Sequence, residues 1–391
     1  MISEEEAREG ILRSTGLLPA RKIALQAALG CYAGHDYAAR IALPIFDNSA
    51  MDGYAVMSTD CRPGARLRII GEQPAGLDRE LRLKAGEAIR IFTGAPIPQG
   101  ADAVVMQEDV AKQNDEIVVN VEVESGEFIR TRGCDLSEGQ KILGKGERIR
   151  ETTLALLASQ GIAELTVGGQ VTAAILSTGD ELAKAGEPLQ PGQIYESNSI
   201  LLQGLLERAG ATVKSAEHCR DDRESLTGAI EQGQMESVLI ITGGVSVGEH
   251  DLVKAALQSL GGKIDIWRVA IKPGKPFLFG RVGDCAVFGL PGNPVSAFVT
   301  FLQFVRPAIL KMMGAANLDP VTVPAKLSVD LGNEGDRAHY FRGKIENGNF
   351  SPVGRQESHA LFGLSQSNAL LRLAPGEKFK AGAMVTAEIW D

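Results

Sequence analysis

Short apolar runs alternate with amphipathic stretches between residues 171 and 313 of this chain. The apolar runs predict strands of a sheet covered on both faces, and the amphipathic stretches predict helices with one buried side. The predicted strands are Val171–Leu176, Thr212–Ala216, Val238–Ile241, Ile264–Ala270, Phe277–Phe279 and Ala286–Phe288, and the predicted helices are 197–209, 221–233, 251–260 and 293–313. This order predicts a doubly wound parallel α/β sheet, in which ligands bind beyond the carboxyl ends of the strands.

The segment before this region has a different pattern. Residues 44–143 alternate short strand-like runs with Gly- and Pro-rich turns, which predicts a β-rich domain. The runs are Arg66–Ile70, Ala88–Ile91, Ala103–Met106 and Glu116–Val123. Helices are predicted on both sides of this domain. Ser3 with Glu6 fits a capping box at the start of a first helix. The apolar pattern predicts a second helical piece over 23–29 and a third helix over 147–162.

The last part of the chain, 318–391, alternates apolar and polar positions without a long helical stretch, which predicts a small β-barrel or sandwich. Its strand-like runs are Val321–Leu327, Tyr340–Ile345, Ala369–Leu373 and Met384–Ile389. The full pattern predicts a multidomain α/β protein, and 391 residues suit two to four domains. The predicted domains are a discontinuous linking domain (1–43 and 144–168), a β-rich domain (44–143), an α/β domain (169–316) and a C-terminal β-barrel (317–391).

Composition removes some classes of function. A net charge of −9 argues against a nucleic-acid binder, which usually carries a basic face, although a local pocket can still be basic. The five cysteines include no C-x-x-C pair, so we expect free thiols rather than a zinc site or a disulfide framework. The acidic N-terminus lacks the apolar region of a signal peptide, and no run approaches the ~20 apolar residues of a membrane span. We therefore expect a cytoplasmic protein without nucleic-acid or membrane partners.

The turn after the third predicted strand is the most informative segment. Thr242-Gly243-Gly244 leads through Ser246 to Asp251 at the start of a predicted helix. Glycines allow close approach of a ligand, and a helix N-terminus favours an anion. A carboxylate in the same turn suits a divalent cation beside a phosphate. The alternative is an ordinary βα loop with solubilising charges.

A second turn, Ser177–Leu182, repeats the combination of strand, glycine and carboxylates. Glu181 is expected beside Asp251, because both follow strands of one sheet, and the two could hold Mg²⁺ against a pyrophosphate. The alternative is a polar turn in which Asp180 caps a helix.

Two further turns could bind an oxyanion. Lys272 and Lys275 lie in a turn stiffened by prolines, where each lysine can serve as a point charge, although a solvated surface turn would look alike. Farther on, Pro294 suits a first helical position with Asn293 as cap, and Ser296 lies among the exposed N–H groups of that turn. A structural helix with a good cap is the alternative. From residues alone, the chain is an α/β protein that handles anions and Mg²⁺.

The chain also resembles a known family through motifs that occur in the family's order between residues 44 and 298. They are PIFDNSAMDGYAV, FTGAPIPQGADAVVMQED, STGDEL, GQIYESNS, TGGVSVGEHD, KPGKP and GLPGNPVSAF. These motifs are similar to those of the molybdopterin molybdenumtransferases, the family of MoeA and the gephyrin E domain. The resemblance implies four domains, the α/β one similar to the adenylyltransferase MogA. It also implies a reaction in which molybdate enters the dithiolene of adenylylated molybdopterin, with Mg²⁺-dependent release of AMP and molybdenum cofactor.

The resemblance also assigns residues. It implies catalytic roles for Asp52, Thr93, Asp135, Glu181, Asp221, Asp251 and Lys272, with Glu181 and Asp251 as the metal ligands. It implies that cofactor and substrate contacts come from Thr242, Gly243, Gly244, Ser246, Lys275, Pro276, Pro291, Pro294 and Ser296, and more loosely from Arg337 and Ser358 as molybdate contacts.

The implied partners are adenylylated molybdopterin, a second copy of the chain in a homodimer whose cleft borrows loops from the partner, and transiently a MogA-like adenylyltransferase. Two other functions stay open: a molybdopterin adenylyltransferase and a non-catalytic molybdopterin-binding scaffold. The sequence does not separate molybdate from tungstate.

Overall fold

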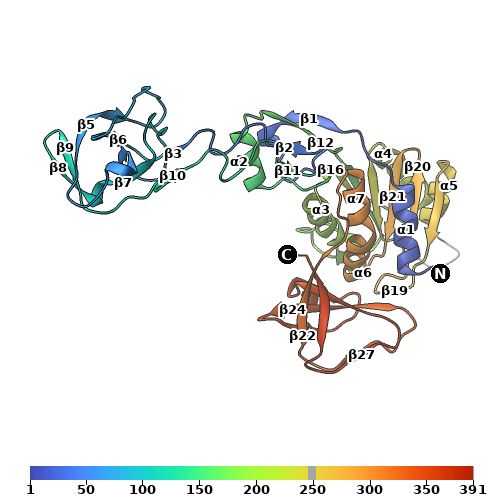
Figure 1. The fold of residues 1–391 in the computed structure, drawn as a ribbon. Coiled ribbons are helices and arrows are strands. Elements are labelled where there is room, and N and C mark those ends of the chain that lie inside the picture. Colours follow the sequence, from blue (N-terminus) through green and yellow to red (C-terminus); the bar gives the residue numbers. More distant parts are fainter. Residues whose placement is uncertain (245–251, 391) are drawn as a thin grey trace. The chain divides into compact units, whose positions relative to one another are not determined.

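The structure, a computed structural model, describes residues 1–244 and 252–390 (Figure 1). These residues form two compact units, which are described separately. The first unit comprises Met1–His35, Lys145–Leu154 and Ala163–Asp391, and the second comprises Asp36–Gly144 and Ala155–Ile162. The predicted site residues Ser246 and Asp251 lie outside the described residues.

A six-stranded sheet forms the centre of the first unit. Its order is β16 (Thr212–Cys219), β13 (Thr172–Thr178), β17 (Val238–Thr242), β21 (Cys285–Leu290), β20 (Leu278–Val282) and β18 (Lys263–Trp267). The pairs from β16 to β21 are parallel, as predicted, but β20 is antiparallel to both β21 and β18, so the prediction of a parallel sheet is wrong at β20. The reason is the two-residue turn at Gly283, since a connection this short joins only antiparallel strands.

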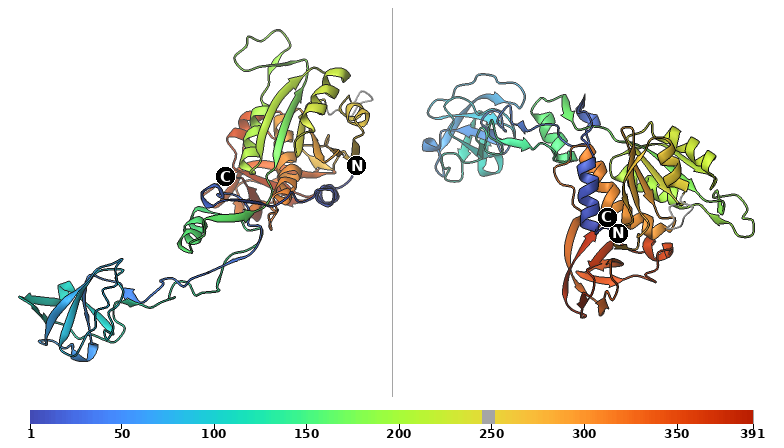
Figure 2. Two further views of the ribbon diagram at one scale, coloured as in Figure 1. Left: turned by 90° about the horizontal axis from the view of Figure 1, so that it is seen from above. Right: turned by 90° about the vertical axis from the view of Figure 1, so that its right-hand side faces the viewer.

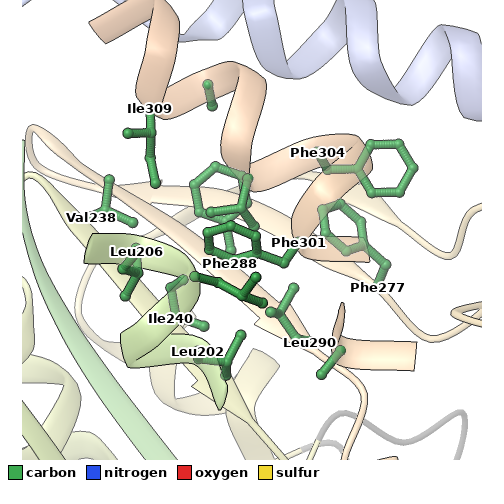
Figure 3. Close-up of a cluster of buried hydrophobic side chains, with 14 of the residues drawn as sticks. Leu202, Leu206, Val238, Ile240, Phe277, Phe288, Leu290, Phe301, Phe304 and Ile309 are labelled. Atoms are coloured by element: carbon green, nitrogen blue, oxygen red, sulfur yellow. The ribbon is translucent and has the colours of Figure 1, made fainter. Parts of the chain in front are cut away.

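Helices cover both faces of this sheet (Figure 2). Alternate residues of one strand point to opposite faces, so Ala173 and Ile175 of β13 join one core while Ala174 and Leu176 join another. The first core receives residues of α1 (Glu4–Ser14), α3 (Asn198–Arg208), α6 (Pro294–Thr300) and α7 (Arg306–Met312), and the second receives those of α4 (Arg223–Gly233) and α5 (Leu252–Ser259). Figure 3 shows the first core, where Leu202 and Leu206 of α3 lie near Ile240, Phe288 and Leu290.

The predicted helix over 293–313 is present but is interrupted. A π-helical turn, Phe301–Val305, separates α6 from α7. Pro307 in the first turn of α7 has no N–H to donate, which removes one regular helical hydrogen bond at this point. The segment Pro294–Met312 is long and apolar enough to cross a membrane, which the sequence analysis overlooked, but 78% of its apolar window is buried inside the unit. That burial is typical of a core helix.

The N-terminal segment shows one confirmed and one wrong prediction. Ser3 and Glu6 form the capping box of α1, as predicted. The prediction of a second helical piece over 23–29 is wrong. Instead, β1 (Arg21–Ala24) pairs antiparallel with β12 (Glu164–Val167), and a short 3-10 turn follows it. Strand pairing across the chain overrides the local helical pattern here. The predicted helix over 147–162 is α2 (Glu151–Ser159).

The C-terminal β-barrel is confirmed. Its five strands are β22 (Val321–Leu327), β25 (Asn349–Pro352), β24 (Ala338–Glu346), β26 (Ala369–Leu373) and β28 (Met384–Ile389), and the pairing of β24 with β26 closes the ring. The short strand β19 (Ile271–Lys272) adds to β24 from the α/β region. Smaller elements beside the barrel are β23 (Leu331–Gly332), β27 (Lys378–Phe379) and α8 (Leu361–Ser365).

The second unit is β-rich, as predicted. Its six-stranded sheet has the order β7 (Ala103–Met106), β4 (Gly53–Val56), β6 (Glu87–Ile91), β5 (Arg66–Gln73), β9 (Glu116–Val119) and β8 (Val110–Gln113). Two short antiparallel pairs accompany it, β2 (Tyr37–Ala38) with β11 (Lys141–Leu143) and β3 (Asn48–Ser49) with β10 (Ile129–Arg130).

Candidate functional site

The carboxyl ends of three parallel strands meet at one edge of the α/β sheet. Ser177 of β13 is level with Thr242 of β17, and Thr242 is level with Leu290 of β21. The residues that follow each strand are therefore neighbours, which places the 178–181, 242–244 and 291–292 turns together. This edge is where ligands of such sheets bind.

Glycines allow the central turn to approach β13 closely. Gly243 has a φ of +88°, and a Cβ added there would lie 2.2 Å from the carbonyl oxygen of Thr178. Gly244 has a φ of +61°, and its added Cβ would lie 2.8 Å from Cγ2 of Thr178. Both positions therefore require glycine for space and for backbone conformation. A glycine turn of this kind, here called the glycine cradle, can present backbone N–H groups to an anion.

Asn198, which the sequence analysis did not select, connects two of these turns, 242–244 and 291–292. Its Nδ2 donates to Oγ1 of Thr242 at 2.9 Å and to the carbonyl oxygen of Gly292 at 2.7 Å. Thr242 Oγ1 in turn lies 3.4 Å from the carbonyl oxygen of Pro291, to which it donates. Oδ1 of Asn198 is buried and has no hydrogen-bond partner among the described residues. The signal was available, since Asn198 is part of the quoted motif GQIYESNS and opens α3.

Acidic groups gather beside this turn. Thr178 donates its hydroxyl hydrogen to Oδ1 of Asp221, and the backbone N–H of Asp221 donates to Oδ1 of Asp180 at 3.4 Å. The alternative in which Asp180 caps a helix is wrong, because the short strand β14 (Leu182–Ala183) follows Asp180 and the next helix, α3, begins only at Asn198.

Glu181 turns back over Gly179, where an added Cβ would lie 2.6 Å from its Oε2. Asp180, Glu181 and Asp221 thus offer carboxylate oxygens from adjoining strand ends, the ligand type that Mg²⁺ prefers. Among the described residues no group of three or more His, Cys, Asp or Glu side chains has metal-site geometry, and Asp251 lies outside them. The donor chemistry fits a Mg²⁺ held by one or two carboxylates together with substrate phosphate oxygens.

The lysine turn packs against α6. Gly274 has a φ of +119°, and an added Cβ would lie 2.6 Å from Cγ2 of Thr300 and 3.8 Å from the carbonyl oxygen of Ser296. Thr300 donates to that carbonyl at 2.7 Å. The structure therefore brings the turn of Lys272 and Lys275 beside the buried Ser296.

The prolines and the C-terminal residues border the same region. Pro291 ends β21, Pro294 occupies the first turn of α6, and Pro276 precedes β20. Asn293 is the N-cap residue of α6, but its side chain does not cap the helix and instead donates from Nδ2 to Oγ of Ser358 at 2.9 Å. Ser358 also accepts from the N–H of Val295 through its carbonyl oxygen at 3.1 Å.

A cavity of about 520 Å³ opens beside Lys272. It is lined by Lys272, Asp330, Leu331, Gly332, Asn333, Glu334, Gly335, His339, Phe341, Lys378, Phe379 and Lys380. Lys272 of β19 is level with His339 of β24, and Arg337 donates from Nη1 to the carbonyl oxygen of Ile271 at 3.2 Å. The barrel therefore fixes the backbone of the lysine turn.

His339 is a second residue that the sequence analysis did not select. Its side chain is buried, with 6% exposed, and its Nε2 has no partner among the described residues. Burial, and after it the positive charge of Lys272, lowers the pKa of His339 from 6.5 to about 4. His339 is therefore neutral at pH 7, so it adds no positive charge next to Lys272.

The second unit holds three of the predicted site residues. Oδ1 of Asp52 accepts from the N–H of Thr93 at 2.8 Å and from its hydroxyl at 2.7 Å. The hydrogen bond from the Thr93 N–H is the main reason that the pKa of Asp52 lies below its usual value, and the Thr93 hydroxyl adds to it. Asp135 is exposed, on a loop held by a hydrogen bond from its N–H to the carbonyl oxygen of Leu43 at 3.0 Å.

Comparison with known families covers most of the chain. Residues 2–161 match the MoeA N-terminal region (domain I and II), 174–311 match a probable molybdopterin binding domain, and 324–390 match the MoeA C-terminal region (domain IV).

Individual relatives extend over nearly the whole length. The chain is 39% identical over 373 residues to the molybdopterin molybdenumtransferase of Haemophilus influenzae, covering 93% of this chain and 92% of the relative. It is 36% identical over 382 residues to molybdopterin molybdenumtransferase 2 of Mycobacterium tuberculosis, covering 94% of each. Among solved structures, the molybdopterin biosynthesis MoeA protein of Pyrococcus horikoshii OT3 matches with a TM-score of 0.85 and 31% identity over 100% of both chains.

The buried His339 predicts a loss of stability in mild acid. Because its pKa is about 4 when folded and 6.5 when unfolded, the unfolded state binds more protons between these values, so stability falls as pH falls through that window. We expect the free energy of unfolding of the wild type to fall by up to about 3 kcal/mol between pH 6.5 and 4 because of this histidine. A His339→Gln variant should not show this loss. Urea unfolding at a series of pH values, with the exposed His359→Gln as control, measures the difference. Parallel pH dependence in wild type and His339→Gln would contradict the prediction.

Proposed function

Because the chain belongs to the molybdopterin molybdenumtransferase family and is a transferase of molybdenum cofactor biosynthesis, we propose that it inserts molybdate into adenylylated molybdopterin and releases AMP. The observation that carries this proposal is the meeting of a glycine cradle, a carboxylate group and a lysine turn around one end of the α/β sheet. Such a site suits a substrate that contains a pyrophosphate together with a second substrate that is a tetrahedral dianion.

In this proposal the Thr242–Gly244 turn receives the phosphates through backbone N–H groups. Asn198 fixes the turn against Gly292, so the cradle is already formed when the substrate arrives. The orphan Oδ1 of Asn198 is free to accept from a donor on the ligand. A preformed cradle lowers the entropic cost of orienting the pyrophosphate.

Glu181 and Asp251 are the proposed Mg²⁺ ligands. Bound Mg²⁺ would supply Lewis-acid stabilisation of the charge that develops on the leaving phosphate. Asp221 is already engaged by Thr178, so it orients the 178–181 turn from which Glu181 projects.

The lysine turn is the proposed molybdate site. Lys272 and Lys275 supply point charges, and Ser296 lies at the N-terminal turn of α6, whose N–H groups also favour an anion. Pro276, Pro291 and Pro294 fix the surrounding backbone, and Arg337 and Ser358 border the region from the C-terminal part.

The two other functions are less well supported. An adenylyltransferase needs the molybdopterin-binding region but not the additional domains. This chain also matches the MoeA N-terminal region over 2–161 and the MoeA C-terminal region over 324–390. A non-catalytic scaffold would not need the carboxylates and lysines of this edge.

We further propose a homodimer in which the Asp52, Thr93 and Asp135 loops of one subunit serve the Glu181 site of the other. The support is that these loops carry exposed polar groups. One of them, the carboxylate of Asp52, accepts a hydrogen bond from the N–H of Thr93 and has a lowered pKa. We also propose a cytoplasmic location and transient contact with a MogA-like adenylyltransferase, which would deliver the substrate.

The direct test is removal of one metal ligand. Glu181→Gln or Asp251→Asn should lose Mg²⁺-dependent AMP release, because a divalent site loses one of its few negative ligands. AMP formation and molybdenum insertion would be measured with purified adenylylated molybdopterin, with Glu187→Gln as control for a charge on the next loop, after β14 (Leu182–Ala183). Near-normal turnover of both variants at saturating Mg²⁺ would refute the metal assignment.

The lysine turn predicts an effect on the second substrate. Lys272→Ala or Lys275→Ala should raise the molybdate concentration for half-maximal insertion about ten- to hundredfold, since a charged contact is worth about 1.5–3 kcal/mol. Binding of the adenylylated pterin should change much less. Lys263→Ala, an exposed lysine of β18, serves as control. If nucleotide affinity falls and the molybdate dependence does not, the lysines serve the pyrophosphate instead.

The shared site predicts complementation between subunits. Asp52→Ala and Asp251→Asn homodimers should each keep only a small residual activity, whereas mixed dimers should recover much more because one of their two clefts is intact. Differently tagged subunits, co-expressed and purified through both tags, provide the sample. An active monomer, or verified mixed dimers without activity, would argue against the shared site.

A further inference from the structure

Arg90 lies at the centre of a contact network around Asp52 and Thr93. It belongs to β6, which pairs antiparallel with β4, and Tyr54 is its partner in the register. Asp52 comes just before β4 and Thr93 comes two residues after β6. Because the start of one antiparallel strand lies beside the end of the other, the two residues meet at this end of the pair.

The guanidinium of Arg90 makes two hydrogen bonds. Nη1 donates to the carbonyl oxygen of Gly53 at 2.9 Å, and Nη2 donates to Oε1 of Gln107 at 2.6 Å. The N–H of Gln107 donates to the carbonyl oxygen of Asp52 at 3.2 Å. Arg90 therefore holds the carbonyl of Gly53 directly and reaches the carbonyl of Asp52 through Gln107.

The same group packs on two aromatic rings. Its Cζ lies 5.2 Å from the ring centre of Tyr54 and 4.9 Å from that of Phe92. Phe92 directly precedes Thr93, so this contact restrains the backbone N–H that donates to Asp52. Arg90 thus contacts the chain next to both members of the Asp52–Thr93 pair.

Neighbouring strands leave little freedom in this arrangement. Strand β4 lies between β6 and β7, and a Cβ added to Gly53 would lie 2.0 Å from the carbonyl oxygen of Val105. The backbone after Asp52 is therefore fixed from the β7 side by packing and from the β6 side by Arg90.

We propose that Arg90 is a positioning residue that sets the geometry of Asp52 and Thr93 for the reaction. The proposal rests on the function proposed for these two residues. Arginine suits this task because its planar fork makes two hydrogen bonds in fixed directions while its faces stack on rings, which the single ammonium of lysine does not do.

Three variants separate positioning from charge and from folding. In Arg90→Met we expect kcat for molybdate insertion to fall about ten- to hundredfold, with a smaller change in KM, because a small misplacement of a reacting group has effects of this size. Arg90→Lys keeps the charge but not the fork, so it should recover little of the loss. Arg68→Met is the matched control, since the exposed side chain of Arg68 on the adjacent strand β5 pairs with Glu87.

A double variant tests the route of the effect. If Arg90 acts through Asp52, adding Arg90→Met to Asp52→Ala should lower kcat no further. Full additivity of the two losses, or full activity of Arg90→Met or Arg90→Lys, would overturn the proposal.

Hydrogen exchange of the Thr93 amide gives a readout that does not depend on activity. This N–H donates to Asp52, so we expect it to exchange faster in Arg90→Met and at the wild-type rate in Arg68→Met, with thermal unfolding recorded for both. Unchanged exchange in Arg90→Met would overturn the positioning role. If Asp52→Ala were fully active while Thr93 exchange still depended on Arg90, the function proposed for Asp52 would fail and the positioning role would stand.

Discussion

The parallel pairing of β13 with β17 and of β17 with β21 is the constraint on which the candidate site depends. It brings the ends of three strands to one edge, so that turns distant in sequence become neighbours. The close approach of Gly243 to the carbonyl of Thr178 then seals the central turn against β13. Any side chain at that position would push these strands apart, and the carboxylates after β13 would lose their relation to the glycine cradle.

In the second unit, antiparallel strand pairing also brings predicted site residues together. There the pairing of β4 with β6 brings the start of one strand beside the end of the other, and Asp52 meets Thr93. The carboxylate of Asp52 is exposed, yet its pKa is lowered because a backbone N–H and a hydroxyl of Thr93 stabilise the charged form. An exposed carboxylate with fixed hydrogen bonds keeps its charge and its direction without the cost of burial.

The fold followed from the sequence wherever pattern and local preference agree. The bounds of β7, β22, β26 and β28 were predicted to the residue, and the capping box of α1 was identified from Ser3 and Glu6. The prediction failed where a distant partner decides, as for β1, whose apolar positions suit a short helix until β12 pairs with it. It failed again at β20, because strand direction depends on connection length rather than on the composition of the strand.

Site residues could be predicted from the sequence only when they belonged to turns whose residue types indicate anion or metal binding. Asn198 and His339 were missed because each acts through burial and through partners that are far away in the sequence. An asparagine that opens a helix resembles an ordinary capping residue until Thr242 and Gly292 are seen on its amide. His339 resembles a surface histidine until β24 is placed beside β19. Its low pKa then has a consequence for the lysine turn: a neutral ring beside Lys272 leaves the positive charge of this region to the lysines and Arg337. An acidic chain can thereby keep a locally basic region to which this histidine adds no charge at neutral pH.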